Sequence, residues 1–312
     1  MFSIALFLGF FSLLPAPAQI KLGIVGTDTS HVLAFTSIFH DVNNPNHVPG
    51  ARIVAAFKGG SPDVESSRTR VDQYAKELES KWGVEIVPTI SALCPKVDGF
   101  LLESVDGRKH LPQFREIATC GKPVFIDKPL ASTLEDAREI ARIGKEKNVP
   151  WFSTSSLRYT EACVNWSSPQ NLGVITWGPG PTEEHHYLDL SWYAVHPIEM
   201  LFTLMGRGCE TVTRTVGKNA DEITCRWKDG RIGTVRSLRP SGDYGVVVFR
   251  EKEILQSPPK MRVNYAPMLK EVVRFFQTKQ PPVPNEDTLE IFAFMDAAQK
   301  SKEQGGKPVK LR

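Results

Sequence analysis

A polar loop close to the N-terminus has the residue types of a phosphate-binding turn. It follows residues 20–26, Ile-Lys-Leu-Gly-Ile-Val-Gly, an apolar run that predicts a buried strand ending at a glycine. In dinucleotide-binding folds such a turn leads into a helix whose first backbone N–H groups bind a pyrophosphate. The candidate cofactor-binding residues here are Gly26, Thr27, Asp28, Thr29, Ser30 and His31.

This loop departs from the G-x-G-x-x-G pattern at two positions. Asp28 stands at the second glycine position and His31 at the third. A carboxylate at Asp28 repels a pyrophosphate, whereas Asp, Thr and Ser all cap helices well. A capped turn with no nucleotide is therefore the alternative interpretation of the loop.

The end of the second predicted strand, residues 51–57, lacks the acid that usually binds the adenosine ribose. Lys58 and Ser61 follow it instead. They could hold a 2′-phosphate, which favours NADP over NAD, although an ordinary turn explains them equally well.

Regular alternation of strands and helices must position these residues. It covers residues 19–150 and predicts a doubly wound parallel sheet, a Rossmann-type nucleotide-binding domain. Strands are expected over 20–26, 51–57, 98–102, 123–126 and 149–154, and helices from 30 and over 68–81, 111–120 and 133–147.

The pattern changes after about residue 159. Strand-like runs separated by glycine and aspartate turns predict an open, mainly antiparallel sheet. We therefore expect an α/β protein whose residues 151–312 form a second domain for substrate binding and oligomerisation, with the last helix returning to the first domain. The runs are 173–177, 222–227 and 245–249, and the expected helices are 193–205, 267–277 and 288–302.

Composition and the N-terminus limit the setting of the protein. The chain has 312 residues, 41% hydrophobic and 23% charged, with a net charge of +3 and no basic stripe, so we expect no nucleic-acid partner. Residues 1–18 are apolar up to Leu14 and end in small residues, which indicates a signal peptide too short for a stable membrane span. We expect export to the periplasm or the extracellular space; a misassigned start would instead imply a cytoplasmic protein.

The five cysteines are widely spaced and contain no Cys-x-x-Cys pair. A zinc site is therefore not expected, and buried free thiols are the favoured interpretation, although export would permit disulfides. The residues are Cys94, Cys120, Cys163, Cys209 and Cys225.

Three segments carry a family resemblance. Residues 121–131, Gly-Lys-Pro-Val-Phe-Ile-Asp-Lys-Pro-Leu-Ala, resemble the GKHVxxEKPLA segment of the Gfo/Idh/MocA oxidoreductases, with Asp127 in place of Glu. Residues 101–110 are similar to the family's loop after the fourth strand, and residues 304–309 to its closing segment. The resemblance implies a nicotinamide cofactor, NAD or NADP, and a sugar-like or polyol substrate bound between two domains.

Site residues follow from this resemblance. It places Asp127, Lys128, Ser104 and Val105 at the cofactor, and makes Lys128 the electrostatic catalyst beside a developing alkoxide. It also makes the Lys128–Pro129 peptide a candidate cis bond.

A second element resembles the family's DxGxHxxD helix. His196 stands at the histidine position as the expected acid/base, and Glu199 stands at the last aspartate. Trp192 replaces the first aspartate, and an indole cannot do the chemistry of a carboxylate. Asp189 could reach the same space.

Four further residues are substrate candidates: His185, His186, Arg158 and Tyr159. The histidines lie in a polar loop, where chance composition explains them better than a metal site, so we predict no metal. Arg158 could bind a carboxylate or a polyol, or hold the domains together.

These observations predict an NAD(P)-dependent oxidoreductase acting on a sugar or related polyol. The family resemblance also implies a homo-oligomer. The degraded glycine loop, Trp192 and the signal peptide support a different class: a non-redox relative, either a saccharide-binding protein or a hydrolase or lyase that uses a tightly bound NAD.

Overall fold

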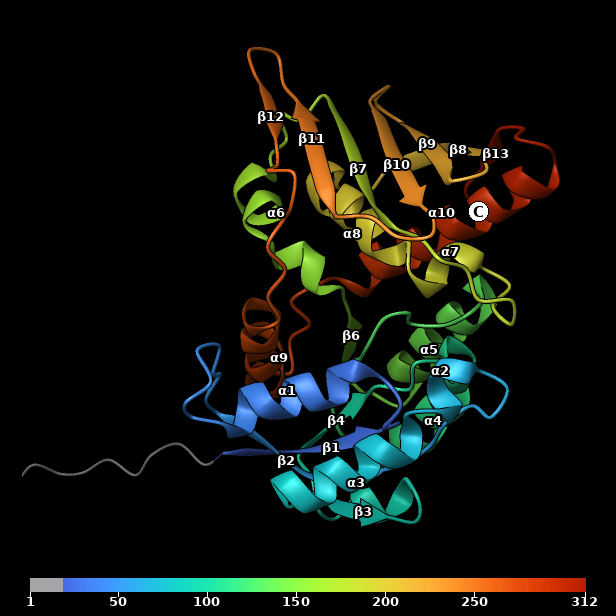
Figure 1. Cartoon of the computed structure of the whole chain (residues 1–312). Helices are drawn as coiled ribbons and strands as arrows, with labels where there is room; N and C mark the ends of the chain where they lie inside the picture. Colours follow the sequence, from blue (N-terminus) through green and yellow to red (C-terminus); the bar gives the residue numbers. More distant parts are fainter. Residues whose placement is uncertain (1–18) are drawn as a thin grey trace, which may run out of the picture.

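A computed structural model describes residues 19–312, which are arranged around two β-sheets (Figure 1). The predicted signal peptide, residues 1–18, lies outside the described residues. The α/β fold class is confirmed.

The first sheet has six parallel strands in the order β3-β2-β1-β4-β5-β6. This order, with β1 at the centre and strands added outward on both sides, is that of a doubly wound nucleotide-binding sheet. The prediction missed only β3. The strands are β1 (Ile20–Val25), β2 (Ala51–Phe57), β3 (Glu85–Val87), β4 (Gly99–Leu102), β5 (Val124–Ile126) and β6 (Trp151–Ser153).

Amphipathic helices cover both faces of this sheet. In α5, Thr133 caps the N-terminus and the buried residues Ala137, Ile140 and Ile143 form one face, as the 3.6-residue period requires. The helices that follow the strands are α1 (Ser30–His40), α2 (Glu65–Arg68), α3 (Val71–Trp82), α4 (His110–Ile117) and α5 (Leu134–Glu146).

One helix on this sheet comes from far along the chain. Helix α9 (Ala266–Thr278) packs its apolar side against α1 and the first sheet (Figure 1), where the rings of Phe152 and Phe275 lie 4.8 Å apart. Gly99 allows this close approach, because a Cβ there would lie 2.4 Å from Phe276. We call the part of the chain packed around the first sheet the first body, and the part packed around the second sheet the second body. Residues beyond 150 therefore complete the core of the first body.

The second sheet has seven strands in the order β12-β11-β7-β10-β9-β8-β13 and is mainly antiparallel, as expected. The exception is the pair β7–β10, which is parallel. The strands are β7 (Gly173–Pro179), β8 (Cys209–Val216), β9 (Ala220–Trp227), β10 (Ile232–Leu238), β11 (Gly245–Phe249), β12 (Ile254–Gln256) and β13 (Val309–Lys310).

Two long helices cover one face of the second sheet. Helix α8 (Val195–Met205) is buried almost throughout, and α10 (Asn285–Glu303) lies between this sheet and α5, so the last helix does contact the first body. Short helix α6 (Glu161–Trp166) lies between β6 and β7 in the chain, and short helix α7 (Asp189–Trp192) lies between β7 and α8.

The prediction of mostly free thiols was wrong. Cys94 bonds to Cys120 and Cys209 to Cys225, while Cys163 is free and buried. Tertiary contacts bring each pair to Cα separations of 5.5 and 6.0 Å, which a sequence without Cys-x-x-Cys spacing does not reveal.

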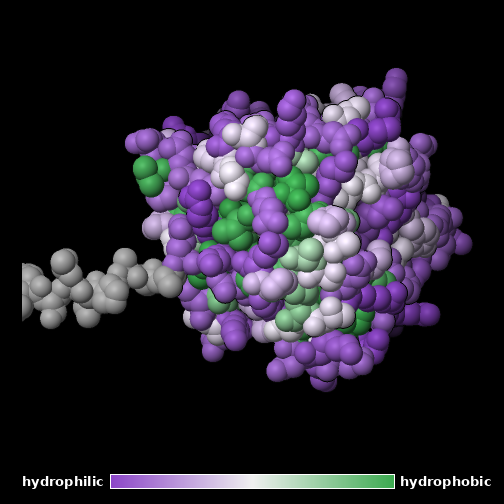
Figure 2. All heavy atoms as spheres, turned by 90° about the horizontal axis from the view of Figure 1, so that it is seen from below, coloured by the Kyte–Doolittle hydropathy of each residue, from purple (hydrophilic) through white to green (hydrophobic). Residues whose placement is uncertain are grey.

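The surface on the side of the first sheet is mostly hydrophilic, with an apolar area near the centre of this face (Figure 2). Within residues 19–312, none of the helices combines the length and apolar character needed to cross a membrane.

Candidate functional site

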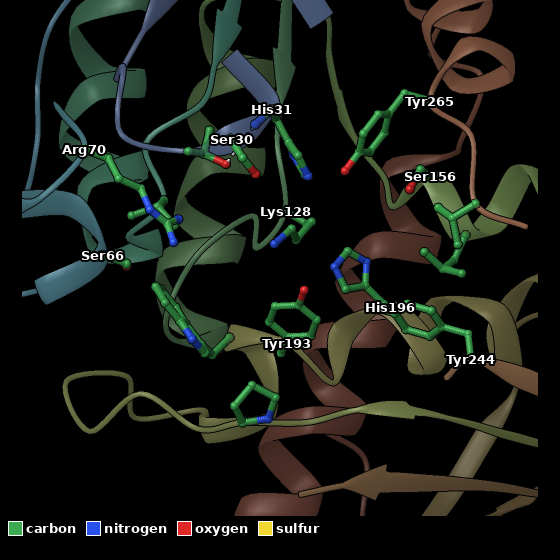
Figure 3. A pocket seen from close by; sticks show the side chains of 16 residues that line it. Ser30, His31, Ser66, Arg70, Lys128, Ser156, Tyr193, His196, Tyr244 and Tyr265 are labelled. Atoms are coloured by element: carbon green, nitrogen blue, oxygen red, sulfur yellow. Dashed lines mark hydrogen bonds between the residues drawn. The ribbon is translucent and has the colours of Figure 1, made fainter. Parts of the chain in front are cut away.

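A cavity of about 510 Å³ lies between the two bodies, at the carboxyl edge of the first sheet (Figure 3). Ligands of open α/β sheets bind at this edge. The first body lines it with Thr29, Ser30, His31, Ser66, Arg70, Val105 and Lys128, and the remaining chain with Ser156, Leu157, Pro181, Trp192, Tyr193, His196, Tyr244, Val263 and Tyr265.

Lys128 is placed by the turn that follows β5, and the Lys128–Pro129 peptide is cis, as predicted. Its ammonium lies 5.3 Å from the centre of the Tyr193 ring. Burial lowers the pKa of Lys128, although the Asp127 carboxylate opposes this shift. The lysine is therefore a desolvated cation aimed into the cavity (Figure 3).

His196 lies in the first turn of α8, on the opposite side of the cavity. Its Nδ1 is 2.7 Å from the Ser155 hydroxyl, and its ring packs edge-on against Tyr193 and Tyr244. Burial, followed by the Lys128 and His31 charges, holds the pKa of His196 well below the usual range. The imidazole is therefore neutral near pH 7.

His31 lies in the first turn of α1 and forms a pair with a carboxylate. Its Nδ1 is 2.6 Å from Asp127 Oδ2. Burial alone would raise the pKa of Asp127, but the charge and hydrogen bond of His31 outweigh it and lower the pKa. His31, which stands at the third glycine position of the G-x-G-x-x-G pattern, thus contacts the Asp127 carboxylate.

Glu103 follows β4, next to the residue that follows β5. It is fully buried, and neither carboxyl oxygen has a hydrogen-bond partner among the described residues. Burial and then the Asp127 charge raise the pKa of Glu103 well above its usual value. Of these two neighbouring acids, Glu103 is therefore neutral and Asp127 carries the charge.

The glycine loop is covered by the chain itself. Asp28 accepts hydrogen bonds from the Ser67 hydroxyl at 2.6 Å and the Val105 amide at 3.0 Å, and the Thr27 hydroxyl donates to the Val71 carbonyl. Thr27 and Asp28 are both fully buried. Gly26 has φ +92° and approaches Ser104 so closely that no side chain fits.

A second network lies over the end of β2. The buried Asp106 carboxylate accepts hydrogen bonds from the Ser61 hydroxyl and from Arg108, and is 3.1 Å from His186 Nε2. Although burial alone raises the pKa of Asp106, these hydrogen bonds lower it far below its usual value. Ser61 and His186 are therefore bound to Asp106 rather than facing the cavity.

Several other predicted site residues lie in contacts outside the cavity lining. Arg158 Nε donates to Glu199 at 2.8 Å, and Asp189 forms ion pairs with Arg214 and Lys302. The remaining ones follow the same pattern: Lys58 pairs with Asp72, His185 with Glu183, Ser104 with Gln113, and Tyr159 does not line the cavity.

Sequence reasoning missed the three tyrosines of the cavity and its Ser66 and Arg70 side chains. Tyr193 lies at the start of the helix predicted over residues 193–205, so its closeness to His196 could have been inferred from the helical spacing. Tyr265, Ser66 and Arg70 carry no local signal, because distant elements bring them in. Across the described range, no group of three or more His, Cys, Asp or Glu is arranged to hold a metal ion.

Residues 20–154 match the family model described as "Oxidoreductase family, NAD-binding Rossmann fold", the GFO_IDH_MocA model. The doubly wound sheet and the Asp127-Lys128-Pro129 turn belong to this matched region. This match contains two of the three segments that carry the sequence resemblance to the Gfo/Idh/MocA oxidoreductases, residues 101–110 and 121–131. The description of this family names NAD, one of the two nucleotides expected from the sequence.

Solved structures of the same fold cover nearly the whole chain. Myo-inositol dehydrogenase from Lactobacillus casei, in complex with NAD(H) and myo-inositol, has a TM-score of 0.73 at 18% identity, covering 95% of this chain and 97% of its own. The WlbA dehydrogenase from Bordetella pertussis, in complex with NADH and UDP-GlcNAcA, has a TM-score of 0.69 at 16% identity, with coverages of 95% and 99%.

An oxidoreductase from Agrobacterium radiobacter, in complex with NAD+, L-tartaric acid and magnesium, has a TM-score of 0.71 at 13% identity, covering 94% and 99%. Comparison with curated protein sequences gives no match. At these identities the structural likeness concerns the fold.

The cavity suits the phosphate and nicotinamide portions of such a nucleotide. Ser30 lies exposed at the N-terminus of α1, the Ser66 hydroxyl is buried without a partner in the described part of the chain, and Arg70 stands beside them. Helix N-termini and guanidinium groups bind phosphates. The adenosine side differs, since residues 61–71 cover the loop there.

Proposed function

We propose that this protein is an NAD(P)-dependent oxidoreductase that acts on a sugar or a related polyol in the cavity between its two bodies. One observation carries the proposal: the Lys128 ammonium, the His196 imidazole and the hydroxyls of Tyr193 and Tyr265 converge on one space (Figure 3). Clustered donors of this kind fit a ligand rich in hydroxyl groups. The neighbour that binds myo-inositol supports the substrate class.

When bound, the nucleotide supplies the hydride acceptor or donor. Ser30, Ser66 and Arg70 would hold its phosphates, and Val105 would line its nicotinamide end. Whether NAD or NADP is preferred follows from contacts on the adenosine side, where Lys58 is the nearest cation in sequence to the end of β2.

The protein's own groups act on the substrate oxygen. The Lys128 ammonium stabilises negative charge that develops on this oxygen, and its desolvation strengthens that attraction. His196, neutral and held by Ser155, accepts the proton of the reacting hydroxyl.

A non-redox relative is the second candidate. It is favoured by the covered adenosine side, where Ser67 and Val71 occupy the hydrogen-bonding groups of the loop. In this case the cavity would bind a saccharide alone, or the protein would be a hydrolase or lyase that keeps one NAD tightly bound.

Calorimetric titration of the purified protein with NAD+, NADH, NADP+ and NADPH tests these alternatives. Polyol oxidation, followed at 340 nm with inositols and hexoses, is the second measurement. Binding with turnover supports the oxidoreductase. No binding at millimolar concentrations, with no nucleotide released on denaturation, overturns it, whereas released nucleotide without exchange supports the tightly bound form.

We also propose that the protein is exported. The two disulfides support this proposal, because such bonds persist in oxidising compartments. Thiol counting on the denatured, unreduced protein from the periplasm should find Cys163 alone; five thiols in that fraction would contradict the proposal.

A homo-oligomer is proposed on the open face of the second sheet. Half-buried side chains of Ile175, Trp177 and Leu238 lie there beside Thr234 and Arg236. Light scattering after gel filtration should give a multiple of the 34.8 kDa chain mass, less the signal peptide. A monomeric mass would exclude this interface.

A further inference from the structure

The two imidazoles of the cavity have different partners. His196 contacts the Ser155 hydroxyl, whereas His31 contacts the Asp127 carboxylate at 2.6 Å. The partner at one ring nitrogen orients an imidazole and determines which nitrogen is left for a ligand. The two rings are therefore suited to different tasks.

The His31 ring is held in place before any ligand arrives. It stacks on Phe35 with ring centres 5.1 Å apart, and Tyr265 packs against its edge at 5.0 Å. Its Nδ1 is taken by Asp127, so Nε2 is the nitrogen left for a ligand. Figure 3 shows a ring nitrogen of His31 directed into the space shared with Lys128 and His196.

The charge behind His31 is fixed by a second acid. Glu103 is buried and neutral, so the negative charge of the two neighbouring carboxyl groups stays on Asp127, which is only 3% exposed. Water therefore competes little for the contact with His31.

This arrangement suits the removal of a proton from carbon next to a carbonyl. Such chemistry needs a base near the C–H bond and donors at the carbonyl oxygen, where charge accumulates. A base on one side, with a neutral imidazole and a cation at the oxygen, is a known pattern for enolisation. Here His31 would be the base, and His196 with Lys128 the donors.

We propose that the Asp127–His31 pair gives this site a further activity: enolisation of a keto sugar. In the neutral form of His31, whose Nδ1–H donates to Asp127, Nε2 takes the proton from the carbon beside the carbonyl. The C–H electron pair forms the carbon–carbon double bond, and the carbonyl π pair moves to oxygen beside Lys128 and His196. Return of a proton from His31 to the same carbon restores the ketone. No oxidant or nucleotide takes part, so the activity stands independently of the proposed oxidation.

Hydrogen–deuterium exchange tests this proposal. The protein is incubated in D2O with dihydroxyacetone, D-fructose or 3-keto-glucose, and loss of the proton beside the carbonyl is followed by NMR. We expect exchange above the buffer rate for at least one of these ketones, and a drop of about 100-fold or more in His31→Gln. The Gln amide can still donate to Asp127, so the variant keeps the buried carboxylate paired.

His47→Gln is the matched control, because His47 lies just after the same helix, contacts a backbone carbonyl and does not line the cavity. Its exchange rate should equal that of the unchanged protein. If no ketone exchanges above the buffer rate, or if His31→Gln and His47→Gln exchange equally fast, the proposal is overturned, whatever the nucleotide titrations show.

Asp127 is a positioning residue in this scheme. Asp127→Asn should lower the maximal exchange rate about tenfold with little change in KM, while Asp127→Glu should recover part of it. A change in KM with an unchanged maximal rate, or equal maximal rates in the Asn and Glu variants, would show a merely structural role for the carboxylate.

Discussion

The two ends of the carboxyl edge of the first sheet differ in how their polar groups are used. Above β2, Asp28, Ser61 and Asp106 are buried and bonded to their own chain. Around Asp127 at the end of β5, Lys128 and His31 face the cavity, and Glu103 at the end of β4 has no partner among the described residues. Satisfied groups stabilise, whereas desolvated and unpaired ones cost stability and persist where chemistry is done. The contrast places stability at one end of the edge and reactivity at the other.

Lys128→Ala gives the largest expected effect and tests the reactive end. Turnover, or ketone exchange if that is the measurable activity, should fall about 100- to 1000-fold, because the charge at the substrate oxygen is lost. Since burial lowers the pKa of Lys128, the folded state holds its charge at a cost. The melting temperature should therefore stay the same or rise. A clear fall would show that Lys128 stabilises the fold, against the assignment of this end to reactivity.

Asp106→Asn tests the stable end. We expect a loss of roughly 2–4 kcal/mol, since Arg108 and His186 keep their positions without the compensating charge. The pKa of Asp106 is lowered in the folded state, so its contribution is present above the unfolded value near ~4 and is lost as the pH falls. Denaturant titrations at several pH values should show a flatter acid limb in the variant.

Asp63→Asn provides the control for that measurement. Asp63 also contacts Arg108, but it lies at the surface, so its replacement should change stability little. Equal losses for the two variants would show that the buried network above β2 is no special source of stability.

Asp28→Gly gives the smallest expected effect and tests whether the covered end of the sheet edge can be opened to a nucleotide. It removes the bond to Ser67, which holds residues 61–71 over the loop, and the bond to the Val105 amide. Nucleotide affinity should rise by up to about tenfold, equivalent to ~1.4 kcal/mol. Calorimetric titration beside the unchanged protein measures it; an unchanged affinity would mean that the covering segment does not compete with the nucleotide.

The first body could be predicted well because its strands and helices are marked by local sequence patterns. The apolar run of β1 and the capped, amphipathic α5 follow periods that a sequence displays directly. The parallel pairing of β7 with β10, and the placement of α9 on the first sheet, depend on contacts between segments far apart in the chain, which no local period records.

The site divides in the same way. Lys128 and His196 were found through segments that resemble a family, whereas Asp189 and Arg158 were chosen for their charge and for their positions near Trp192 and after the last strand of the first sheet. Charged residues near a site find partners through tertiary contacts, as Asp189 does with Arg214, and composition does not show this in advance. His31 was assigned to the cofactor; its contact with Asp127 joins residues 96 positions apart.

The position of α9 on the first sheet has a consequence for how the protein is made. During synthesis, the face of the sheet that α9 covers keeps its apolar residues uncovered until residue 278 has left the ribosome, long after Ser153 has closed the sheet itself. Exposed apolar surface of this kind favours aggregation. A nascent chain of this protein therefore needs protection over more than a hundred residues of elongation, which a chain with contiguous domains would not require.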